Sequence, residues 1–595
     1  MTDQPTPAFT RVLFRMIRQQ PVRYGFALFL WVTIWTIPIL IGLITAHFFD
    51  ALTDEIPVTT LTMLVGAVLV YAVVRSMFIF MAMRNHASLL FRAAATMRRN
   101  LLVRIYELPG AAGLRETPGE NVSRFRDDVE HIVEPFDLFV DFVGALVSGL
   151  IAFGIMLTID PVITSVVAIP VLIVAIVSNR TGGLVRRYRK QARDATEAIT
   201  GFLGETFAAT QAVKVAGAEA HMLRRFQDLN DVRKTMMVRD RTLTAVLEAV
   251  FRNTVNIGTG LILLLAAGRL AATGAAGISL GEFALFVFLL HLVTDSAYFY
   301  GMFIARVKQG SVSVERLTST MSGEPWERLV DRTELGLDTE PTGLTREVEK
   351  PGPFESLSIR DLSYHYPGST NGIDGVDLDI ALGEFVVLTG RIGSGKTTLL
   401  RAILGLLPAE GGTIEWNGEP VDDPATWLIP PRVAYTSQVP RLFSMSLEDN
   451  LVLGAKLSDD ELAESIHIAT MRHDIELMPD GLETLVGPRG VRLSGGQVQR
   501  SAAARMFTRA PQLLVLDDVS SALDVETEQT LWRRLFEARS DVAALVVSHR
   551  HSALARADRV VVMEKGRVVA VGTAEQLAET SEAFQAIWEG VVGGG

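Results

Sequence analysis

The sequence of 595 residues contains no cysteine, so disulfide bonds, zinc–thiolate sites and thiol catalysis are excluded. Basic residues are also outnumbered by acidic ones. The chain has 56 lysine and arginine residues and 67 aspartate and glutamate residues, for a net charge of −11. A general nucleic-acid binder would carry a basic surface, so we expect no nucleic-acid partner. The segment 1–20 lacks a short apolar core with a small-residue cleavage site, and we expect no cleaved signal peptide.

Apolar residues, in contrast, are plentiful. They make up 49% of the chain, which is high for a soluble protein of this length and points to a lipid bilayer. Six mostly uncharged runs are predicted to span it. These runs are 25–49, 58–83, 142–159, 162–177, 243–272 and 280–304.

Basic residues predict the orientation of these spans. They gather before the first run and in the long polar connections 84–137 and 179–242, whereas the short connection 50–55 is acidic or neutral. By the positive-inside rule both termini are cytoplasmic, and the long connections project as helices into the cytoplasm. We expect a multi-pass protein of the plasma (inner) membrane of a bacterium.

The second half has a different pattern. Segment 322–353 is polar, without a sustained period, and is predicted to be a linker. From Phe354 onward, short β-type runs alternate with helical segments, as in an α/β domain with a largely parallel sheet. The runs are 385–388, 433–436, 513–516, 544–547 and 560–563. The predicted fold is therefore an α-helical transmembrane domain (1–321), a linker (322–353) and an α/β domain (354–595).

A phosphate-binding motif follows the run 385–388. Its members are Gly390, Arg391, Ile392, Gly393, Ser394, Gly395, Lys396 and Thr397. This is G-x-x-x-x-G-K-[ST] between a predicted strand and a predicted helix starting at Thr398 (398–407). Glycine N–H groups and the helix N-terminus can surround phosphate oxygens. Lys396 can reach the β- and γ-phosphates and Thr397 can ligate Mg²⁺, so a nucleotide and Mg²⁺ are the predicted cofactors.

Two further features belong to the same chemistry. Asp517 ends the run 513–516, where a carboxylate can hold Mg²⁺ through water. A second phosphate-binding helix start precedes the predicted helix 498–507. It consists of Leu493, Ser494, Gly495, Gly496 and Gln497. If both phosphate sites point outward, this start must serve a second copy of the domain, facing head to tail with nucleotide between the two.

With these motifs in order, the chain resembles an ABC exporter half-transporter, a six-helix transmembrane domain fused to one ATP-binding cassette, over about residues 8–588. The resemblance implies ATP and Mg²⁺ as cofactors. It implies that Tyr366 stacks on adenine and that Gln438 touches Mg²⁺ and communicates with the membrane domain. It further implies that His549 contacts the γ-phosphate and that Ser521–Asp524, ending in Asp524, is the D-loop.

The resemblance also places two coupling helices, near Ala111–Asp127 and Gly204–Ala220, the second reaching the partner's nucleotide domain. Two positions depart from the family pattern. Family members usually have glutamate, which activates the attacking water, where this chain has Asp518, and they usually have glutamate at the position of Pro488. The shorter aspartate sets its carboxylate back by about 1.5 Å, and a displacement near 1 Å can cost roughly 10²-fold in rate.

In the family that the chain resembles, a slow site of this kind often belongs to a heterodimer. The resemblance therefore favours a heterodimer with a related half-transporter, in which Leu493–Gln497 completes the faster site of the partner; a homodimer stays possible. The expected function is ATP-driven export of a small molecule, lipid or peptide. Siderophore-type import on the same fold and an ATP-gated regulatory subunit with little hydrolysis remain alternatives. A soluble ABC ATPase does not explain the six apolar runs.

Polar residues inside the spans are candidates for a substrate cavity. His291 and Asp295 are four residues apart and share one face of the sixth span. Arg252 and Asn256 lie in the fifth span and could join them. An interhelical hydrogen-bond cluster or a subunit contact explains the same four residues equally well.

Overall fold

The computed structural model describes residues 7–53, 57–108, 110, 118–270, 278–321, 323–332, 352–488, 491–519 and 523–592. The chain forms two compact units. The first comprises residues 1–101 and 119–335, and the second residues 102–118 and 336–595.

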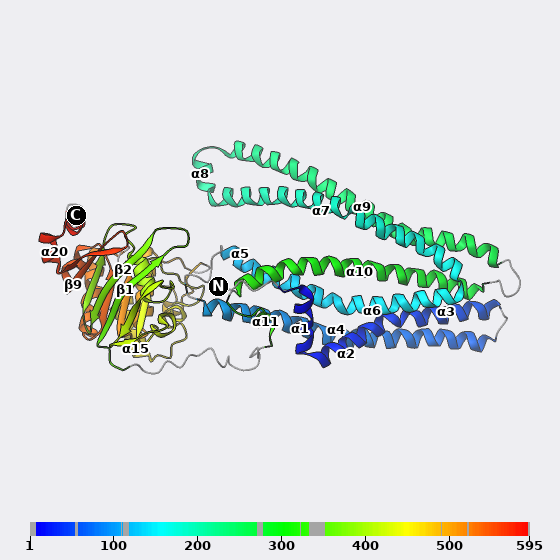
Figure 1. Ribbon diagram of the computed structural model, residues 1–595, viewed down its shortest axis with the longest axis horizontal. Helices are drawn as coiled ribbons and strands as arrows, with labels where there is room; N and C mark the ends of the chain where they lie inside the picture. The colour runs from blue at the N-terminus through cyan, green and yellow to red at the C-terminus, as the bar shows by residue number, and fades with distance from the viewer. Residues whose placement is uncertain are drawn as a thin grey trace. The chain divides into compact units, whose positions relative to one another are not determined.

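The first unit is helical throughout its described part (Figure 1). Its elements are α1 (Phe9–Gln19), α2 (Pro21–Thr36), α3 (Pro38–Thr53), α4 (Val58–Glu107, whose last turns group with the second unit), α5 (Pro118–Ser123), the π-helical turn η1 (Arg124–Asp128), α6 (Val129–Ile159), α7 (Pro161–Ala208), α8 (Thr210–Val215), α9 (Glu219–Leu270), α10 (Leu280–Thr320) and α11 (Glu327–Val330).

Four helical segments of the described chain are long and apolar enough to cross a membrane. They are Pro21–Leu52, Val58–Glu107, Gly119–Ile159 and Leu280–Thr320. The other two predicted runs are 162–177, which lies on α7 and of which several side chains are not described, and 243–272, which lies at the end of α9 except for residues 271 and 272, outside the described part. The prediction of a helical membrane region is therefore confirmed.

The first predicted span is not one continuous helix. The hydrogen-bond ladder is interrupted at Ile37, between α2 and α3, although the backbone there stays in the helical region, because Pro38 has no backbone N–H to continue the ladder and its ring opposes the preceding turn. The sequence analysis treated residues 25–49 as one uninterrupted run and missed this break.

Small residues let α2 approach α6 closely. Gly144, Ser148 and Ala152 follow one another at intervals of four and form one stripe of α6. A Cβ at Gly144 would lie 2.5 Å from the Trp35 ring, and the Ser148 hydroxyl donates a 2.7 Å hydrogen bond to the Trp35 carbonyl. Such stripes are typical of helix pairs packed inside membranes.

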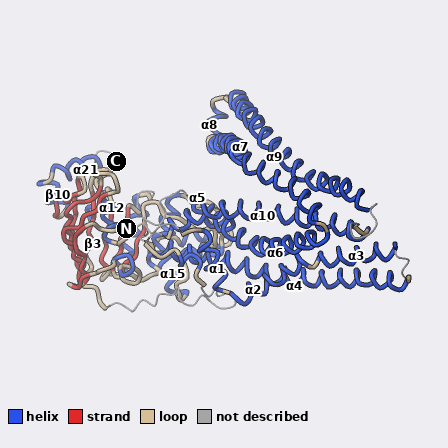
Figure 2. Tube along the Cα trace, turned by 45° about the vertical axis from the view of Figure 1, so that its right-hand side comes forward, coloured by secondary structure: helices blue, strands red, loops and turns tan. Residues whose placement is uncertain are grey.

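Helices α7 and α9 form a long hairpin with α8 at its tip (Figures 1 and 2). At 1.5 Å per residue each helix is more than 70 Å long, well beyond the roughly 30 Å apolar thickness of a bilayer. The prediction that polar connections continue the spans as helices is thus confirmed for residues 179–242.

The second unit contains two sheets. The six-stranded sheet has the order β10-β9-β3-β8-β7-β6, parallel except for β10, and the four-stranded antiparallel sheet has the order β2-β1-β4-β5. The strands are β1 (Ser356–His365), β2 (Gly372–Ala381), β3 (Phe385–Thr389), β4 (Gly411–Trp416), β5 (Glu419–Pro420), β6 (Val433–Thr436), β7 (Leu513–Asp517), β8 (Ala543–Val547), β9 (Arg559–Glu564) and β10 (Arg567–Gly572). The helices are α12 (Lys396–Ile403), α13 (Pro424–Trp427), α14 (Leu447–Val452), α15 (Asp459–Ile468), α16 (Arg472–Glu476), η2 (Gly481–Glu483), α17 (Gly495–Phe507), α18 (Val525–Ala538), α19 (His551–Arg556), α20 (Ala574–Thr580) and α21 (Glu582–Val592).

Both faces of the six-stranded sheet are buried. Along β3, Phe385 and Val387 belong to one hydrophobic core, while Val386 and Leu388 belong to another. The same alternation runs through β7 and β8, since side chains alternate between the two faces of a strand. Burial on both faces explains why these strands are continuous apolar runs in the sequence.

The predicted α/β domain with a largely parallel sheet is confirmed, and all five predicted runs lie on strands of the six-stranded sheet. Two helix predictions need correction. Helix α12 begins at Lys396 and ends at Ile403, instead of spanning 398–407, and α17 begins at Gly495 instead of Val498. The separate antiparallel sheet was not anticipated.

Candidate functional site

The predicted site residues meet at one edge of the six-stranded sheet. Strands β3, β8, β7 and β6 are neighbours and parallel, so their carboxyl ends share an edge. The phosphate-binding motif follows β3, His549 follows β8, Asp517 ends β7 and Gln438 follows β6. Ligands of open α/β sheets bind at such edges.

The backbone of the phosphate-binding motif requires glycine. Gly390 has a φ of +146°, and a Cβ there would lie 2.2 Å from the Met563 carbonyl oxygen. Gly395 precedes α12 with a φ of +103°. Ile392, at the outer part of the loop, is fully exposed. The loop therefore reaches the start of α12 through conformations that side chains would oppose, and the first N–H groups of that helix are free of intrahelical partners.

Lys396 is folded into this loop. Its ammonium donates hydrogen bonds to the carbonyls of Gly390 at 2.7 Å and Arg391 at 3.0 Å. Burial lowers the pKa of Lys396, and the nearby carboxylates of Asp517 and Asp518 oppose that shift. The side chain is a buried cation held by neutral carbonyl groups, which a phosphate could replace with a stronger, charge-assisted partner.

Thr397 and Asp517 form a pair suited to a hard cation. The Thr397 hydroxyl donates a 3.1 Å hydrogen bond to Asp517 Oδ1, and the second carboxylate oxygen is buried without a hydrogen-bond partner. Burial raises the pKa of Asp517, which is only 1% exposed. A buried carboxylate oxygen without a donor fits a site where Mg²⁺ would supply the missing charge. Across the described chain no three His, Cys, Asp or Glu side chains cluster to hold a metal ion.

Asp518 contacts the predicted Q-loop glutamine. Gln438 Nε2 donates a 3.3 Å hydrogen bond to Asp518 Oδ2, and the Asp518 backbone N–H bonds the Val547 carbonyl at 3.1 Å. Asp518 has a φ of +53°, a region in which aspartate is several-fold enriched among non-glycine residues. Burial raises the pKa of its carboxyl group, and the Gln438 hydrogen bond opposes that shift. Aspartate at position 518 is therefore compatible with the positive φ of its backbone.

His549 lies beside the end of β3. Its Nδ1 is 3.2 Å from the hydroxyl of Thr389, the residue before Gly390. Burial lowers the pKa of His549, and the positive charge of Lys396 lowers it further. Both effects favour the neutral ring, which has one donor and one acceptor nitrogen.

The segment after His549 is held by a buried acid that the sequence analysis missed. Glu528 of α18 is 1% exposed, pairs with Arg550 Nη1 at 3.3 Å and accepts a 2.9 Å hydrogen bond from Ser552 Oγ. An acidic residue in a first helical turn is read from sequence as a favourable partner of the helix dipole. No local pattern pairs it with a residue 22 positions later, so only the fold reveals this anchor.

The remaining nucleotide residues are placed as follows. The Tyr366 hydroxyl lies 3.3 Å from that of Thr398, and the Tyr366 ring meets Tyr364 edge-on at 5.2 Å. Asp524 caps α18 by accepting the Thr527 backbone N–H at 2.8 Å. Of the predicted D-loop, Ser521 and Ala522 lie outside the described residues.

The motif Leu493–Gln497 forms the start of α17. Ser494 and Gln497 make a capping box, in which each side chain accepts from the other's backbone N–H. Asp474 accepts hydrogen bonds from Gln497 Nε2 at 3.0 Å and Arg500 Nη2 at 2.7 Å. Gly495 is exposed. This start is rigidly held and open to solvent, and Asp474 is a supporting residue without a signal in the sequence.

The predicted coupling segments are partly described. Within Gly204–Ala220 the short helix α8 has no buried residue. Of Ala111–Asp127, residues 111–117 lie outside the described part, and the rest forms α5 and most of η1. Pro488 is exposed next to Gly487.

The described cavity candidates do not pair with one another through a recorded hydrogen bond. His291 and Asp295 are exposed on α10, where the nearest polar partner of His291 Nδ1 is the Val287 carbonyl, 3.2 Å away in the same helix. Asn256 is exposed on α9 and contacts Asn253 at 3.3 Å. The side chain of Arg252 lies outside the described residues.

Comparisons with known proteins agree with this architecture. The family described as "ABC transporter transmembrane region" matches residues 25–296, and the family described as "ABC transporter" matches residues 373–521. An ATP-dependent lipid A-core flippase of Thiobacillus denitrificans is 31% identical over 415 residues, which cover 69% of this chain and 68% of the flippase. The chain belongs to the ABC transporter family.

Two further relatives show a similar level of sequence identity. An ATP-dependent lipid A-core flippase of Chromobacterium violaceum is 28% identical over 81% of this chain and 80% of its own length. The Bacillus subtilis protein named probable multidrug resistance ABC transporter ATP-binding/permease protein YheI is 27% identical over 74% of this chain and 72% of its own length. As an ABC half-transporter, this chain joins one membrane region to one ATP-binding domain, as the sequence predicted.

Proposed function

We propose that this chain is one half of a dimeric exporter that uses ATP to move a small molecule, lipid or peptide across a bilayer. The observation that carries the proposal is the meeting of Lys396, Thr397 and Asp517 at one sheet edge, in a chain that also has a membrane region. The flippase and multidrug names of its relatives favour export of an amphipathic substrate. A membrane domain (1–321), a linker (322–353) and a nucleotide-binding domain (354–595) are the proposed parts.

Each nucleotide residue has a proposed task. Lys396 binds the β- and γ-phosphates, Thr397 and Asp517 hold Mg²⁺, and Gln438 touches the same ion. Asp518 orients the attacking water, and His549 contacts the γ-phosphate. Bound ATP supplies the phosphoanhydride whose hydrolysis resets the transporter. Tyr366 stacks on adenine, while Leu493–Gln497 and Asp524 act in the site of a second chain.

Exposed apolar side chains on the α7–α9 hairpin support a dimer. Leu223, Val232 and Val238 of α9 are 61%, 53% and 56% exposed, and Val215 of α8 is 91% exposed. These positions precede the apolar run 243–272, so lipid does not explain them. A second chain that covers the hairpin would remove this surface from water. The positive-inside charge pattern supports a cytoplasmic location of both termini and the nucleotide-binding domain, at a bacterial inner membrane.

The partner of this chain is proposed to be a related half-transporter with an intact catalytic glutamate. We expect the purified chain alone to bind ATP but to hydrolyse it slowly, and coexpression with such a partner to restore turnover. The measurement is ATPase activity and ATP-driven export in proteoliposomes for the chain alone and for the pair. A stable dimer of this chain alone with full transport-coupled ATPase activity would rule out the heterodimer and leave the homodimer.

Asp518→Glu tests whether side-chain length limits hydrolysis. If the carboxylate is set back from the water, the extra methylene should raise ATP turnover by about 10-fold to 10²-fold. The positive φ of Asp518 opposes glutamate slightly, which sets the lower value. Single-turnover ATP hydrolysis by the pair is the measurement, with Asp541→Asn, an exposed change, as control. No gain would favour the ATP-gated regulatory subunit over an active but slow site.

A further inference from the structure

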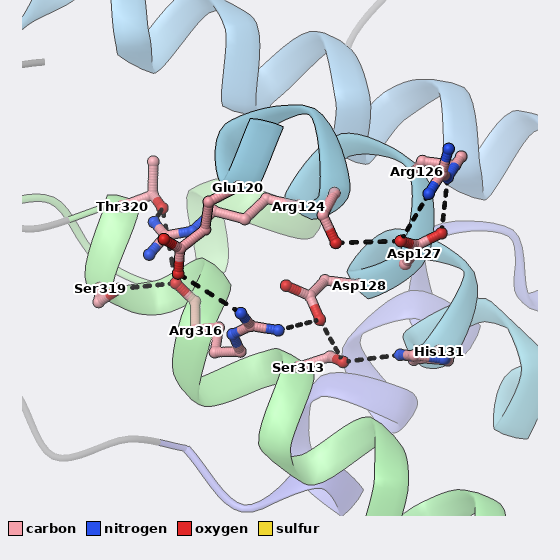
Figure 3. A network of polar contacts seen from close by, with 11 residues as sticks. Glu120, Arg124, Arg126, Asp127, Asp128, His131, Ser313, Arg316, Ser319 and Thr320 are labelled. Carbon is pink, nitrogen blue, oxygen red and sulfur yellow. Dashed lines mark hydrogen bonds and ion pairs between the residues drawn. The ribbon is translucent and has the colours of Figure 1, made fainter. Parts of the chain in front are cut away.

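A polar network centred on a buried aspartate joins the N-terminal end of α6 to the C-terminal end of α10 (Figure 3). None of the residues in it was singled out by the sequence analysis, and the nucleotide site does not use them. Asp128 lies 14 residues before Phe142, where the apolar part of α6 begins, or about 21 Å along a helix. The network is therefore on the polar extensions of both helices, outside the apolar spans.

Asp128 is the centre of this network. It is 2% exposed, its Oδ1 accepts a 2.8 Å hydrogen bond from Ser313 Oγ, and Arg316 Nη1 lies 3.5 Å from the same oxygen. Its other oxygen is buried without a hydrogen-bond partner. A buried carboxylate is strongly destabilising when it loses its partners, so the contacts to α10 define where this helix end can sit.

Further contacts cross between the two helix ends. Arg316 also pairs with Glu120 of α5 at 3.6 Å, and Ser313 Oγ lies 3.3 Å from His131 Nδ1 of α6. Arg124 donates to the hydroxyl of Thr320, in the last turn of α10. The contacts thus span α10 from Ser313 to Thr320, so the two ends cannot slide past each other without breaking several of them.

The backbone at this point is unusual and closely packed. Residues 124–128 form a π-helical turn, and its two buried members are Arg124 and Asp128, the residues that contact α10. Single π-turns inside α-helices are rare and are frequently found at functional sites. A Cβ at Gly310 of α10 would lie 2.8 Å from the His131 carbonyl oxygen, so the two backbones touch with no space for a side chain.

The network lies where two covalent connections leave the membrane region. The first proposed coupling segment, Ala111–Asp127, ends directly before Asp128, and the chain after α10 continues through the linker to the nucleotide-binding domain. We propose that Asp128, bound by Ser313 and Arg316, is a positioning residue that makes the ends of α6 and α10 move as one body. Movement of the nucleotide-binding domain then reaches both helices together. The inference rests on the proposed function, since it needs an ATP-driven movement to transmit.

The absence of cysteine makes the test direct, because spin labels can be attached at introduced cysteines in the full chain. Labels at the exposed residues Val122 and Val312 report the separation of the two helix ends. Labelled chain, diluted with unlabelled chain in lipid nanodiscs, is measured by pulsed dipolar spectroscopy with and without Mg-ATP. We expect one narrow distance that ATP leaves unchanged. In Asp128→Asn the distance distribution should broaden and shift with ATP.

Asp127→Asn is the matched control. Asp127 adjoins Asp128, but its hydrogen bonds from Ser123 at 3.0 Å and Arg126 at 2.7 Å stay within its own segment. It should behave as the wild type. A second readout is hydrogen exchange of α10 residues 280–304, which ATP should slow in the wild type and not in Asp128→Asn. Basal ATP turnover should stay within about twofold, because Asp128 touches no nucleotide residue.

The outcomes separate the inference from the proposed function. If ATP changes neither hydrogen exchange nor any other property of the wild type, the proposed function fails. If the wild type responds and Asp128→Asn responds identically, the inference alone is overturned. Should Asp128→Asn not fold, Ser313→Ala takes its place, since it removes the 2.8 Å hydrogen bond to Asp128 together with the 3.3 Å contact to His131 and leaves the carboxylate intact. If the distance distribution of Ser313→Ala is as narrow and as insensitive to ATP as that of the wild type, the inference is overturned equally.

Discussion

Replacing Lys396 with alanine is expected to weaken ATP binding by about 10²-fold to 10⁴-fold, since two hydrogen bonds to charged groups contribute about 1.5–3 kcal/mol each and a factor of ten corresponds to about 1.4 kcal/mol. In the structure the Lys396 ammonium donates hydrogen bonds to the Gly390 and Arg391 carbonyls. In the ATP-bound state two phosphates would take the place of these carbonyls. ATP hydrolysis and export should fall with occupancy. Equilibrium titration with a fluorescent ATP analogue gives the affinity.

Lys456→Ala is the control for this loss of charge. Lys456 is exposed in the loop between α14 and α15, so its removal changes the net charge by the same amount. The ATP affinity of the Lys456→Ala variant should match that of the wild type. Equal affinities of Lys396→Ala and Lys456→Ala would contradict the assignment of the phosphate-binding motif.

Asp517→Asn should separate function from stability. We expect Mg²⁺-dependent ATP turnover to drop by about 10²-fold or more, because a neutral amide is a poor ligand for a hard cation. In buffer with a chelator, the same variant should melt at the wild-type temperature or above it. The amide oxygen can still accept the hydrogen bond from Thr397, and the variant buries no charge.

The difference in stability between metal-free Asp517→Asn and the metal-free wild type should depend on pH with a defined sign. Burial raises the pKa of Asp517 above that of the unfolded chain, so the folded state binds more protons between the two values. Its stability contribution is complete below the unfolded pKa and is lost as the pH rises through the folded pKa. The metal-free wild type should therefore approach Asp517→Asn in stability as the pH falls. Asp541→Asn, on an exposed carboxylate, should show no such convergence. A metal-free variant clearly less stable than the wild type at neutral pH would contradict this account.

Local sequence patterns were enough to predict several of the strands and the phosphate-binding motif. The strands β3, β7 and β8 are apolar runs because both of their faces are buried, and the phosphate-binding motif carries its own backbone requirement in its glycines. Each of these signals lies within a few residues. The break at Pro38 could also have been read, since proline lacks the N–H that a helix interior needs.

Long-range pairing required the fold. The order β3-β8-β7-β6 brings Gln438 and Asp518 within 3.3 Å although 80 residues separate them. Glu528 and Arg550, or Asp128 and Ser313, give no local sign of one another, because surface and buried acids look alike in a sequence. The motif Gly390–Thr397 predicts a phosphate site from sequence alone. Which carboxylate, hydroxyl and imidazole lie beside that motif depends on strand order, and strand order is set by packing of the whole sheet.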